Sequence, residues 1–155
     1  MADVNIKYGT STSITYSPGA LTDGSARECT AVDNASNLYV DAMLEVLVKC
    51  GATPTGEKAA HIYFYGSEDG TDFTDNATGS DAALTMRDPT NLRGPFVVNC
   101  PNSSATDYKV VIGSVAAFFG GVLPREWGFV CHNKTGVTMV TGGTASYTGI
   151  EYTVA

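Results

Sequence analysis

Two histidines and four cysteines are the residues of this chain whose types could support nucleophilic catalysis. Such catalysis needs a Ser, Thr or Cys side chain within hydrogen-bond reach of a base, most often a histidine. Cys131 and His132 are adjacent, but adjacent side chains of a strand point to opposite faces of a sheet. His61 could face a cysteine across a sheet, yet the chain contains no GxSxG or HExxH motif. We interpret both histidines as strand residues with satisfied hydrogen bonds and expect no enzymatic activity.

The second group that could do chemistry is an acidic stretch from Gly66 to Asp81, which contains no Lys or Arg. Carboxylate oxygens are ligands that Ca²⁺ prefers, but the spacing does not match an EF-hand loop, which needs acids at alternate positions and a distal Glu. A glycosidase needs a cleft between two carboxylates, which one loop does not make. We interpret the stretch as a solvated surface loop, and calcium binding stays open. Its acids are Glu68, Asp69, Asp72, Asp75 and Asp81.

The four cysteines are Cys29, Cys50, Cys100 and Cys131, and no two form a CxxC pair. A structural zinc site therefore has almost no support, and we expect neither a metal nor a cofactor. Each cysteine lies among apolar residues, where a free thiol behaves as a small hydrophobe. The N-terminal residues show no signal-peptide pattern, so we expect folding in a reducing cytoplasm with free thiols. If the thiols were oxidised, three pairings would be possible.

Length and composition describe a globular β-protein. The 155 residues predict a single domain, and 43% apolar residues are enough to form a core. Only 16% of the residues are charged, and the net charge is −7. No basic patch is present, which argues against direct binding of nucleic acid. No apolar run is long enough to span a membrane.

The segment from Leu38 to Cys50 decides the fold class. Its Leu, Ala, Met and Glu residues favour a helix by propensity. All its even positions are apolar, however, and they would surround a helix but form one buried face of a strand. We therefore predict a long strand with this face: Leu38, Val40, Ala42, Leu44, Val46, Val48 and Cys50.

Other strands are predicted between turn signals. They cover residues 5–8, 11–16, 25–32, 59–65, 82–86, 96–100, 107–113, 137–140 and 145–154, with a further strand opening at Trp127. Ser114 could cap one helical turn over residues 115–119. This pattern predicts an all-β fold, an antiparallel β-sandwich resembling a jelly roll, with at most one short helical turn. Residues 1–24 would form an N-terminal arm or edge strands, and residues 25–155 the sandwich.

The stretch from Ala117 to Gly136 contains the only tryptophan, Trp127, which we expect to anchor the core. From Gly128 the side chains alternate, and the turn 133–136 would form a hairpin with residues 137–140. Gly120 and Gly121 would allow close approach of two backbone segments. The corner over residues 118–124 is either ordinary core packing or an exposed contact with a partner.

Three groups of residues, in this order, resemble small structural proteins of tailed bacteriophages encoded among the head genes. They are Thr30–Asn34 with Asn37–Ala42, Gly79–Ala83 running to Asp88–Leu92, and Phe119–Pro124 with Trp127-Gly128 and Asn133–Gly136. Some such proteins are capsid decoration, or cement, proteins with a jelly-roll-like sandwich. The resemblance covers roughly residues 25–155, and the Gly-Gly-Val-Leu-Pro…Trp-Gly combination is its most specific part.

The resemblance implies a non-enzymatic virion protein, made in the host cytoplasm, that binds the major capsid protein on the capsid exterior as a dimer or trimer. An N-terminal arm could add a strand to a neighbouring sheet. The other candidate contact is the corner, with Phe118, Phe119, Leu123, Pro124 and Arg125. The alternative is a receptor- or carbohydrate-binding module of a phage head fibre or tail, with exposed tyrosines such as Tyr63, Tyr65 or Tyr147 as a sugar platform.

Overall fold

The computed structural model describes residues 3–101 and 106–154, and strands dominate them. The strands are β1 (Val4–Tyr8), β2 (Thr12–Ile14), β3 (Ala26–Glu28), β4 (Val32–Asp33), β5 (Asp41–Lys49), β6 (Ala59–Ser67), β7 (Ala82–Leu84), β8 (Arg93–Asn99), β9 (Asp107–Ile112), β10 (Glu126–Lys134) and β11 (Thr144–Val154). Two short helical elements, α1 (Asn34–Asn37) and the 3₁₀ turn η1 (Ala116–Phe119), lie between them.

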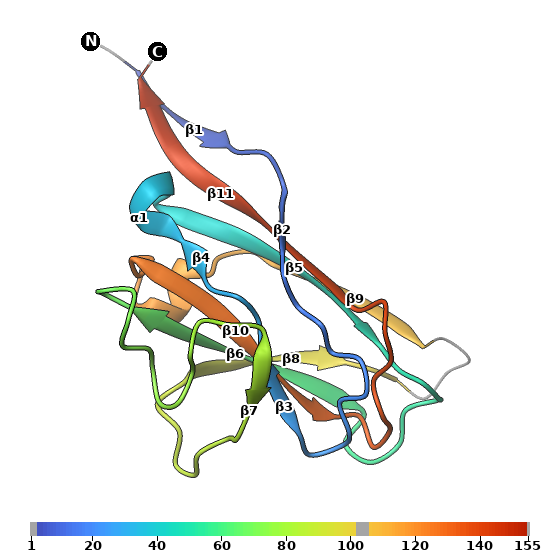
Figure 1. The fold of residues 1–155 in the computed structure, drawn as a ribbon. Coiled ribbons are helices and arrows are strands. Elements are labelled where there is room, and N and C mark those ends of the chain that lie inside the picture. The colour runs from blue at the N-terminus through green and yellow to red at the C-terminus, as the bar shows by residue number, and fades with distance from the viewer. Residues whose placement is uncertain (1–2, 102–105, 155) are drawn as a thin grey trace.

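The strands form two antiparallel sheets packed face to face (Figure 1). One sheet has the order β1-β11-β5-β9, with β2 also paired to β11. The other has the order β7-β3-β10-β6-β8, with β4 also paired to β10. Strands of the first half pair with strands of the second half in reverse order: β2 with β11, β3 with β10, β5 with β9, and β6 with β8. This is a long hairpin rolled into two sheets, the jelly-roll arrangement. The predicted all-β jelly-roll-like sandwich is confirmed.

The main core lies between the sheets and follows the alternation of the sequence. On β5 the predicted face is fully buried from Ala42 to Val48, and on β10 Trp127 and Phe129 point into the same core. Trp127 is the largest fully buried side chain, and its ring meets the Tyr147 ring edge-on at 5.7 Å. Burying an indole at the centre removes a large apolar area from water in one place. Trp127 is thus the core anchor that its sequence context predicted.

A smaller apolar cluster covers the other face of the second sheet. It joins Tyr65, Val130 and, on β7, Leu84 of the sheet to Ala77 and Leu92 of the loops between β6 and β8. The Tyr65 hydroxyl donates to the Cys29 carbonyl oxygen at 2.6 Å, which satisfies its buried polar end. Because this cluster covers that face, the acidic stretch lies against the sandwich.

The strand predicted from Leu38 begins later than expected. The Asp33 carboxylate accepts hydrogen bonds from the Ala35 and Ser36 backbone N–H groups, which caps the unpredicted helical turn α1. Leu38 ends that turn with a φ of 57°, in the left-handed region. Leu38 and Val40 are consequently exposed and do not belong to the buried face of β5.

Two other predicted segments pair differently. Residues 25–32 form β3 and β4 rather than one strand, because the Thr30 N–H donates to Thr15 and the Ala31 N–H donates to Gly79. Residues 137–140 do not form a hairpin with β10. Strands β3 and β6 already occupy both edges of β10, and Met139 forms an isolated bridge with Cys50 instead.

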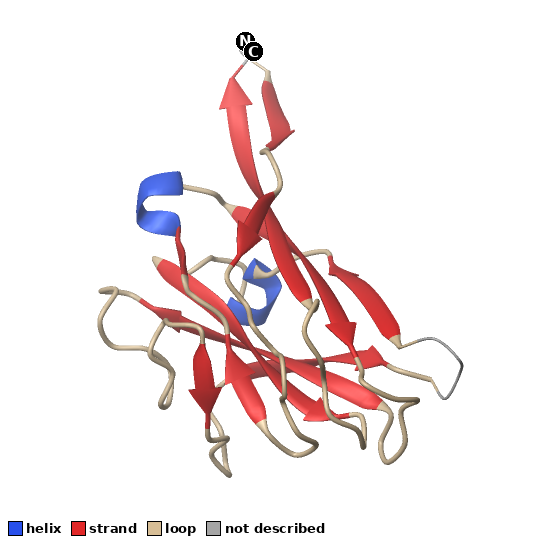
Figure 2. Cartoon of the chain, turned by 45° about the vertical axis from the view of Figure 1, so that its right-hand side comes forward, coloured by secondary structure: helices blue, strands red, loops and turns tan. Residues whose placement is uncertain are grey.

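The N-terminal residues divide into two parts. Strand β1 extends beyond the sandwich beside the end of β11, where both termini lie (Figures 1 and 2). By contrast, Ile14, Tyr16 and Leu21 are buried in the main core.

Candidate functional site

The corner that precedes β10 is held rigidly by the sheet beneath it. The Asp41 carboxylate accepts hydrogen bonds from the Ser114 hydroxyl at 2.6 Å and from the Ala116 N–H at 2.9 Å. The Ser114 hydroxyl in turn accepts from the Ala117 N–H at 3.2 Å. The predicted Ser114 cap is displaced by one residue, because Val115 holds the cap position of η1 and makes no side-chain cap hydrogen bond. Gly120 and Gly121 have φ values of 81° and 99°, which explains the glycine pair. No backbone lies close to either glycine, so the expected close approach is not their role.

The five residues predicted as an interface are brought together at this corner, but most of them face inward. The Phe118 ring packs on the Phe64 ring with centroids 4.4 Å apart, and Phe119 approaches the same ring edge-on at 6.5 Å. Leu123 is buried. Pro124 lies directly over Gly66, where a Cβ atom would be 2.6 Å from the proline ring. Arg125 is exposed.

Val122, which sequence reasoning did not single out, presents the apolar surface of this corner to solvent. Its exposed fraction is 73%, the highest of the large apolar residues in the corner. The feature of the sequence that could have indicated this exposure is the position of Val122 directly after two glycines, which bend the chain outward.

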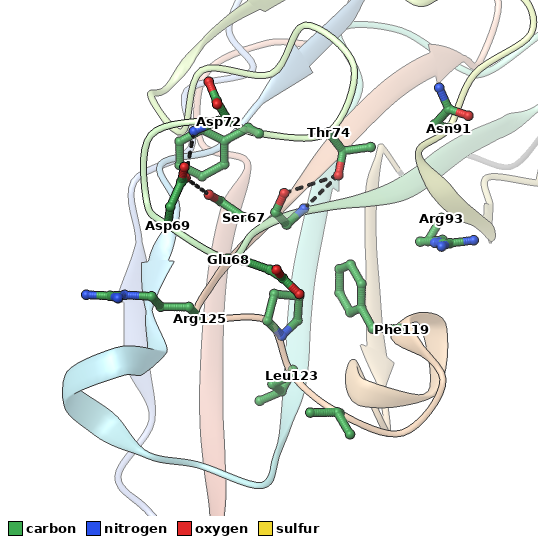
Figure 3. Close-up of a pocket in the computed structure, with 14 residues that line it drawn as sticks. Ser67, Glu68, Asp69, Asp72, Thr74, Asn91, Arg93, Phe119, Leu123 and Arg125 are labelled. Atoms are coloured by element: carbon green, nitrogen blue, oxygen red, sulfur yellow. Dashed lines mark hydrogen bonds between the residues drawn. The ribbon is translucent and has the colours of Figure 1, made fainter.

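The corner forms one wall of a groove of about 1080 Å³ (Figure 3). The opposite wall is the first part of the acidic stretch. These two segments meet because β6 and β10 are neighbours, with Ser67 directly opposite Glu126 in the register. The groove is lined by Gly66, Ser67, Glu68, Asp69, Asp72, Phe73, Thr74, Asn91, Arg93, Phe119, Val122, Leu123, Pro124 and Arg125.

Several carboxylates of the acidic stretch accept hydrogen bonds from other groups of the protein. The Asp69 carboxylate accepts from the Thr71 and Asp72 N–H groups and from the Ser67 hydroxyl, which holds its pKa well below the usual range. The Asp75 side chain is almost fully buried and accepts from Thr90 and Asn91. Glu68, Asp69 and Asp72 are the exposed acids of the groove wall.

Asp81 is also held by the protein. Its carboxylate accepts from the Arg27 guanidinium at 2.6 Å and from the Ser17 N–H at 3.2 Å. Burial alone would raise the pKa of Asp81, but these hydrogen bonds and the Arg27 charge outweigh burial and lower it. The interpretation as a solvated surface loop therefore holds for Glu68, Asp69 and Asp72, which are exposed, and is wrong for Asp75 and Asp81. Across residues 3–101 and 106–154, no three His, Cys, Asp or Glu side chains are arranged to hold a metal ion.

A buried carboxylate that the sequence did not reveal fixes this loop. Glu28 on β3 is fully buried, and its oxygens accept from the Thr78 N–H, the Thr78 hydroxyl and the Gly79 N–H at 2.8–3.2 Å. A carboxylate only accepts, so it matches a set of donors. Glu28 thereby ties the far end of the acidic stretch to the sheet. The one hint in the sequence was that Glu28 lies two residues after apolar Ala26, which places both side chains on the same face of the strand.

The histidines lie opposite one another rather than beside a cysteine. His61 and His132 are cross-strand partners on β6 and β10, with ring centroids 6.4 Å apart. The His132 Nε2 atom lies 3.2 Å from the Gly24 carbonyl oxygen. Cys131 points into the core on the opposite face, and burial raises its pKa to about 12. A protonated, buried thiol is a poor nucleophile.

The tyrosines considered for a sugar platform do not form an exposed surface. Tyr65 and Tyr147 are buried, and Tyr63 is half-buried. A sugar-binding face would need exposed rings, so that arrangement is wrong for two of the three residues.

Comparison of the chain with protein-family models, curated proteins and solved structures finds no match. Neither helical element in the described ranges is long and apolar enough to cross a membrane.

Proposed function

We propose that this chain is a non-enzymatic structural protein of a phage head, which binds the major capsid protein on the capsid exterior and stabilises the shell as a homo-oligomer. The sequence resemblance to decoration proteins motivates the proposal. The jelly roll supports it by analogy, because viral capsid domains use this architecture, although a fold alone does not define a function.

The observation that carries the proposal is the exposed Val122 on a rigid corner beside the groove. Val122 lies beside apolar Phe119 and Leu123, and Arg93 and Arg125 also line the groove. This composition is that of a protein interface with an apolar centre and a polar rim. A loop of the shell protein would bury Val122 there. Because symmetry repeats each contact over the shell, one modest interface per copy is sufficient.

The alternative function, a receptor- or carbohydrate-binding module, also occurs on jelly rolls. The three tyrosines at the expected positions do not favour it, because Tyr65 and Tyr147 are buried and Tyr63 is half-buried. The exposed tyrosines of the described residues, Tyr8 and Tyr152, lie on the strand pair of β1 and β11.

The test is binding of the purified protein to heads of a phage that lacks this gene. Val122→Asp would place a charge in the contact and should reduce occupancy at least tenfold, which is about 1.4 kcal/mol. Val111→Asp is the matched control, since Val111 is also an exposed valine but lies on β9. Equal decoration by wild type and Val122→Asp would remove the corner from the interface. No binding of the wild type would contradict the proposal itself.

A further inference from the structure

The two termini of the described chain form a ribbon that leaves the sandwich. Strand β1 pairs with the last residues of β11 in the register Val4–Val154, Ile6–Tyr152 and Tyr8–Ile150 (Figures 1 and 2). At its base the Tyr39 ring packs against Gly149, and the Gly9 N–H donates to the Gly149 carbonyl oxygen at 2.8 Å. The ribbon is therefore fixed to the sandwich at its base and extends away from it (Figure 1).

The ribbon is amphipathic across its two faces. Directly opposed residues of an antiparallel pair share a face, so one face holds only apolar side chains: Val4, Ile6, Tyr8, Ile150, Tyr152 and Val154. The other face carries Asn5, Thr153 and an ion pair, in which the Lys7 Nζ atom lies 2.7 Å from the Glu151 carboxylate. The polar face suits water, and the apolar face does not.

This apolar face is the main exposed hydrophobic surface in the described part of the chain. Five of its six side chains are 61–73% exposed, and they are half of the ten large apolar side chains that are exposed there. The others are divided among β8, β9, the corner and the segment before β5. A two-stranded ribbon is marginal in water by itself, and a contiguous exposed apolar face is typical of an interaction site.

We propose that this face binds the same face of a second copy, so that two ribbons stack around a two-fold axis. The face carries no charge, and a partner recognised by it must offer an apolar surface of the same narrow shape. The chain itself supplies such a surface, and a two-fold axis makes it self-complementary.

The sizes of the side chains indicate an antiparallel stack. The tip of the ribbon carries two small residues, Val4 and Val154, whereas the base carries the larger Tyr8 and Ile150. Antiparallel stacking places each valine tip over the bulky base of the other copy and places the Ile6–Tyr152 pairs together at the axis. Small against large side chains fill the space between two stacked sheets, which lie about 10 Å apart.

The area is sufficient for a reversible dimer. From their exposed fractions the five residues offer roughly 600 Å² per copy, so the dimer would bury at most roughly 1,200 Å², at the lower limit of specific interfaces. Each copy also carries a net charge of −7, which opposes association and is screened by salt. We therefore expect a concentration-dependent dimer that is more stable at high ionic strength.

The test uses the isolated protein, so it does not depend on the capsid proposal and can fail independently of it. Sedimentation velocity over about 1–100 μM should show a monomer–dimer equilibrium for the wild type. The double variant Ile6→Thr/Tyr152→Thr keeps β-propensity but removes the apolar centre, and its dimer should weaken at least tenfold. Val111→Thr, exposed on β9, is the matched control and should dimerise as the wild type does.

Cysteine cross-linking tests the geometry of the stack. The native cysteines are buried, so an introduced thiol on the ribbon is the accessible one. Stacked strands about 10 Å apart are too distant for a direct disulfide, so a short bifunctional thiol reagent is used. A mixture of Val4→Cys and Tyr8→Cys proteins should form the mixed cross-linked dimer with this reagent, and Val4→Cys alone should not cross-link. A monomeric wild type at the highest concentration, an unchanged dimer in the double variant, or cross-linking of Val4→Cys with itself alone would each overturn the proposed stack.

Discussion

The buried Glu28 carboxylate should be one of the most sensitive positions for stability. Replacing it with Ala leaves the Thr78 N–H, the Thr78 hydroxyl and the Gly79 N–H without their acceptor. A buried donor that loses its partner costs about 1–3 kcal/mol, but Thr78 is exposed and Gly79 is half-buried, so access of water to these donors reduces the total loss of stability to about 3 kcal/mol. For a chain of this length that corresponds to a fall in Tm of about 6–12 °C. Glu28→Gln keeps one acceptor oxygen but turns an amide donor toward other donors. We therefore expect this variant to lose about 1–2 kcal/mol of stability.

The assay is urea unfolding of both variants, with Glu45→Gln as the matched control. Glu45 pairs with Lys109 at 2.9 Å on the surface, and an exposed ion pair contributes less than about 1 kcal/mol. The reasoning is refuted if Glu28→Ala loses no more stability than Glu45→Gln. A loss confined to the groove wall, with an unchanged global transition, would instead show that Glu28 anchors only the loop.

Two further predictions concern titratable groups. The pKa of the Asp81 carboxyl is lower in the folded state than in the unfolded state. The Asp81 carboxylate therefore contributes fully to the free energy of unfolding above the ordinary Asp pKa of about 4, and this contribution is lost as the pH falls through the folded-state pKa. The stability difference between wild type and Asp81→Asn should therefore shrink in unfolding experiments below about pH 4, and a constant difference would contradict the Arg27 pairing. Burial raises the pKa of Cys29, Cys100 and Cys131 to about 12, so these thiols should react with a thiol reagent only after unfolding. Rapid reaction in native buffer would be inconsistent with that burial.

Patterns with a period of two residues predicted the strands well. The alternation from Ala42 to Cys50 identified a buried strand face despite helix-forming residues, because burial of one face outweighs intrinsic propensity. Trp127 was predicted as a core anchor for a different reason, because an indole buries a large apolar area in one place. The alternation was misleading at Leu38, because the Asp33 side chain caps a helical turn directly before it.

Strand pairing could not be predicted, because a local pattern does not specify a distant partner. Residues 137–140 resembled the second strand of a hairpin, but β3 and β6, far away in the sequence, occupy both edges of β10. The groove depends on the same pairing, since the register between β6 and β10 brings the acidic stretch to the corner. The ribbon likewise depends on pairing between the two ends of the chain.

The residue types of the corner could not distinguish an interface from the core. Phe118, Phe119 and Leu123 were candidates because they are apolar and clustered, which is also what core residues are. The structure turns them toward Phe64 and the core and leaves Val122 outside. Their role in an interface stays a prediction, which the Val122→Asp experiment tests.

The most direct test of the proposed function is the copy number of this chain in purified virions, measured by quantitative mass spectrometry against the major capsid protein. A decoration protein should be present in a number comparable with that of the capsid protein. A handful of copies per particle would indicate a vertex, fibre or tail component. Complete absence from the particle would contradict the account.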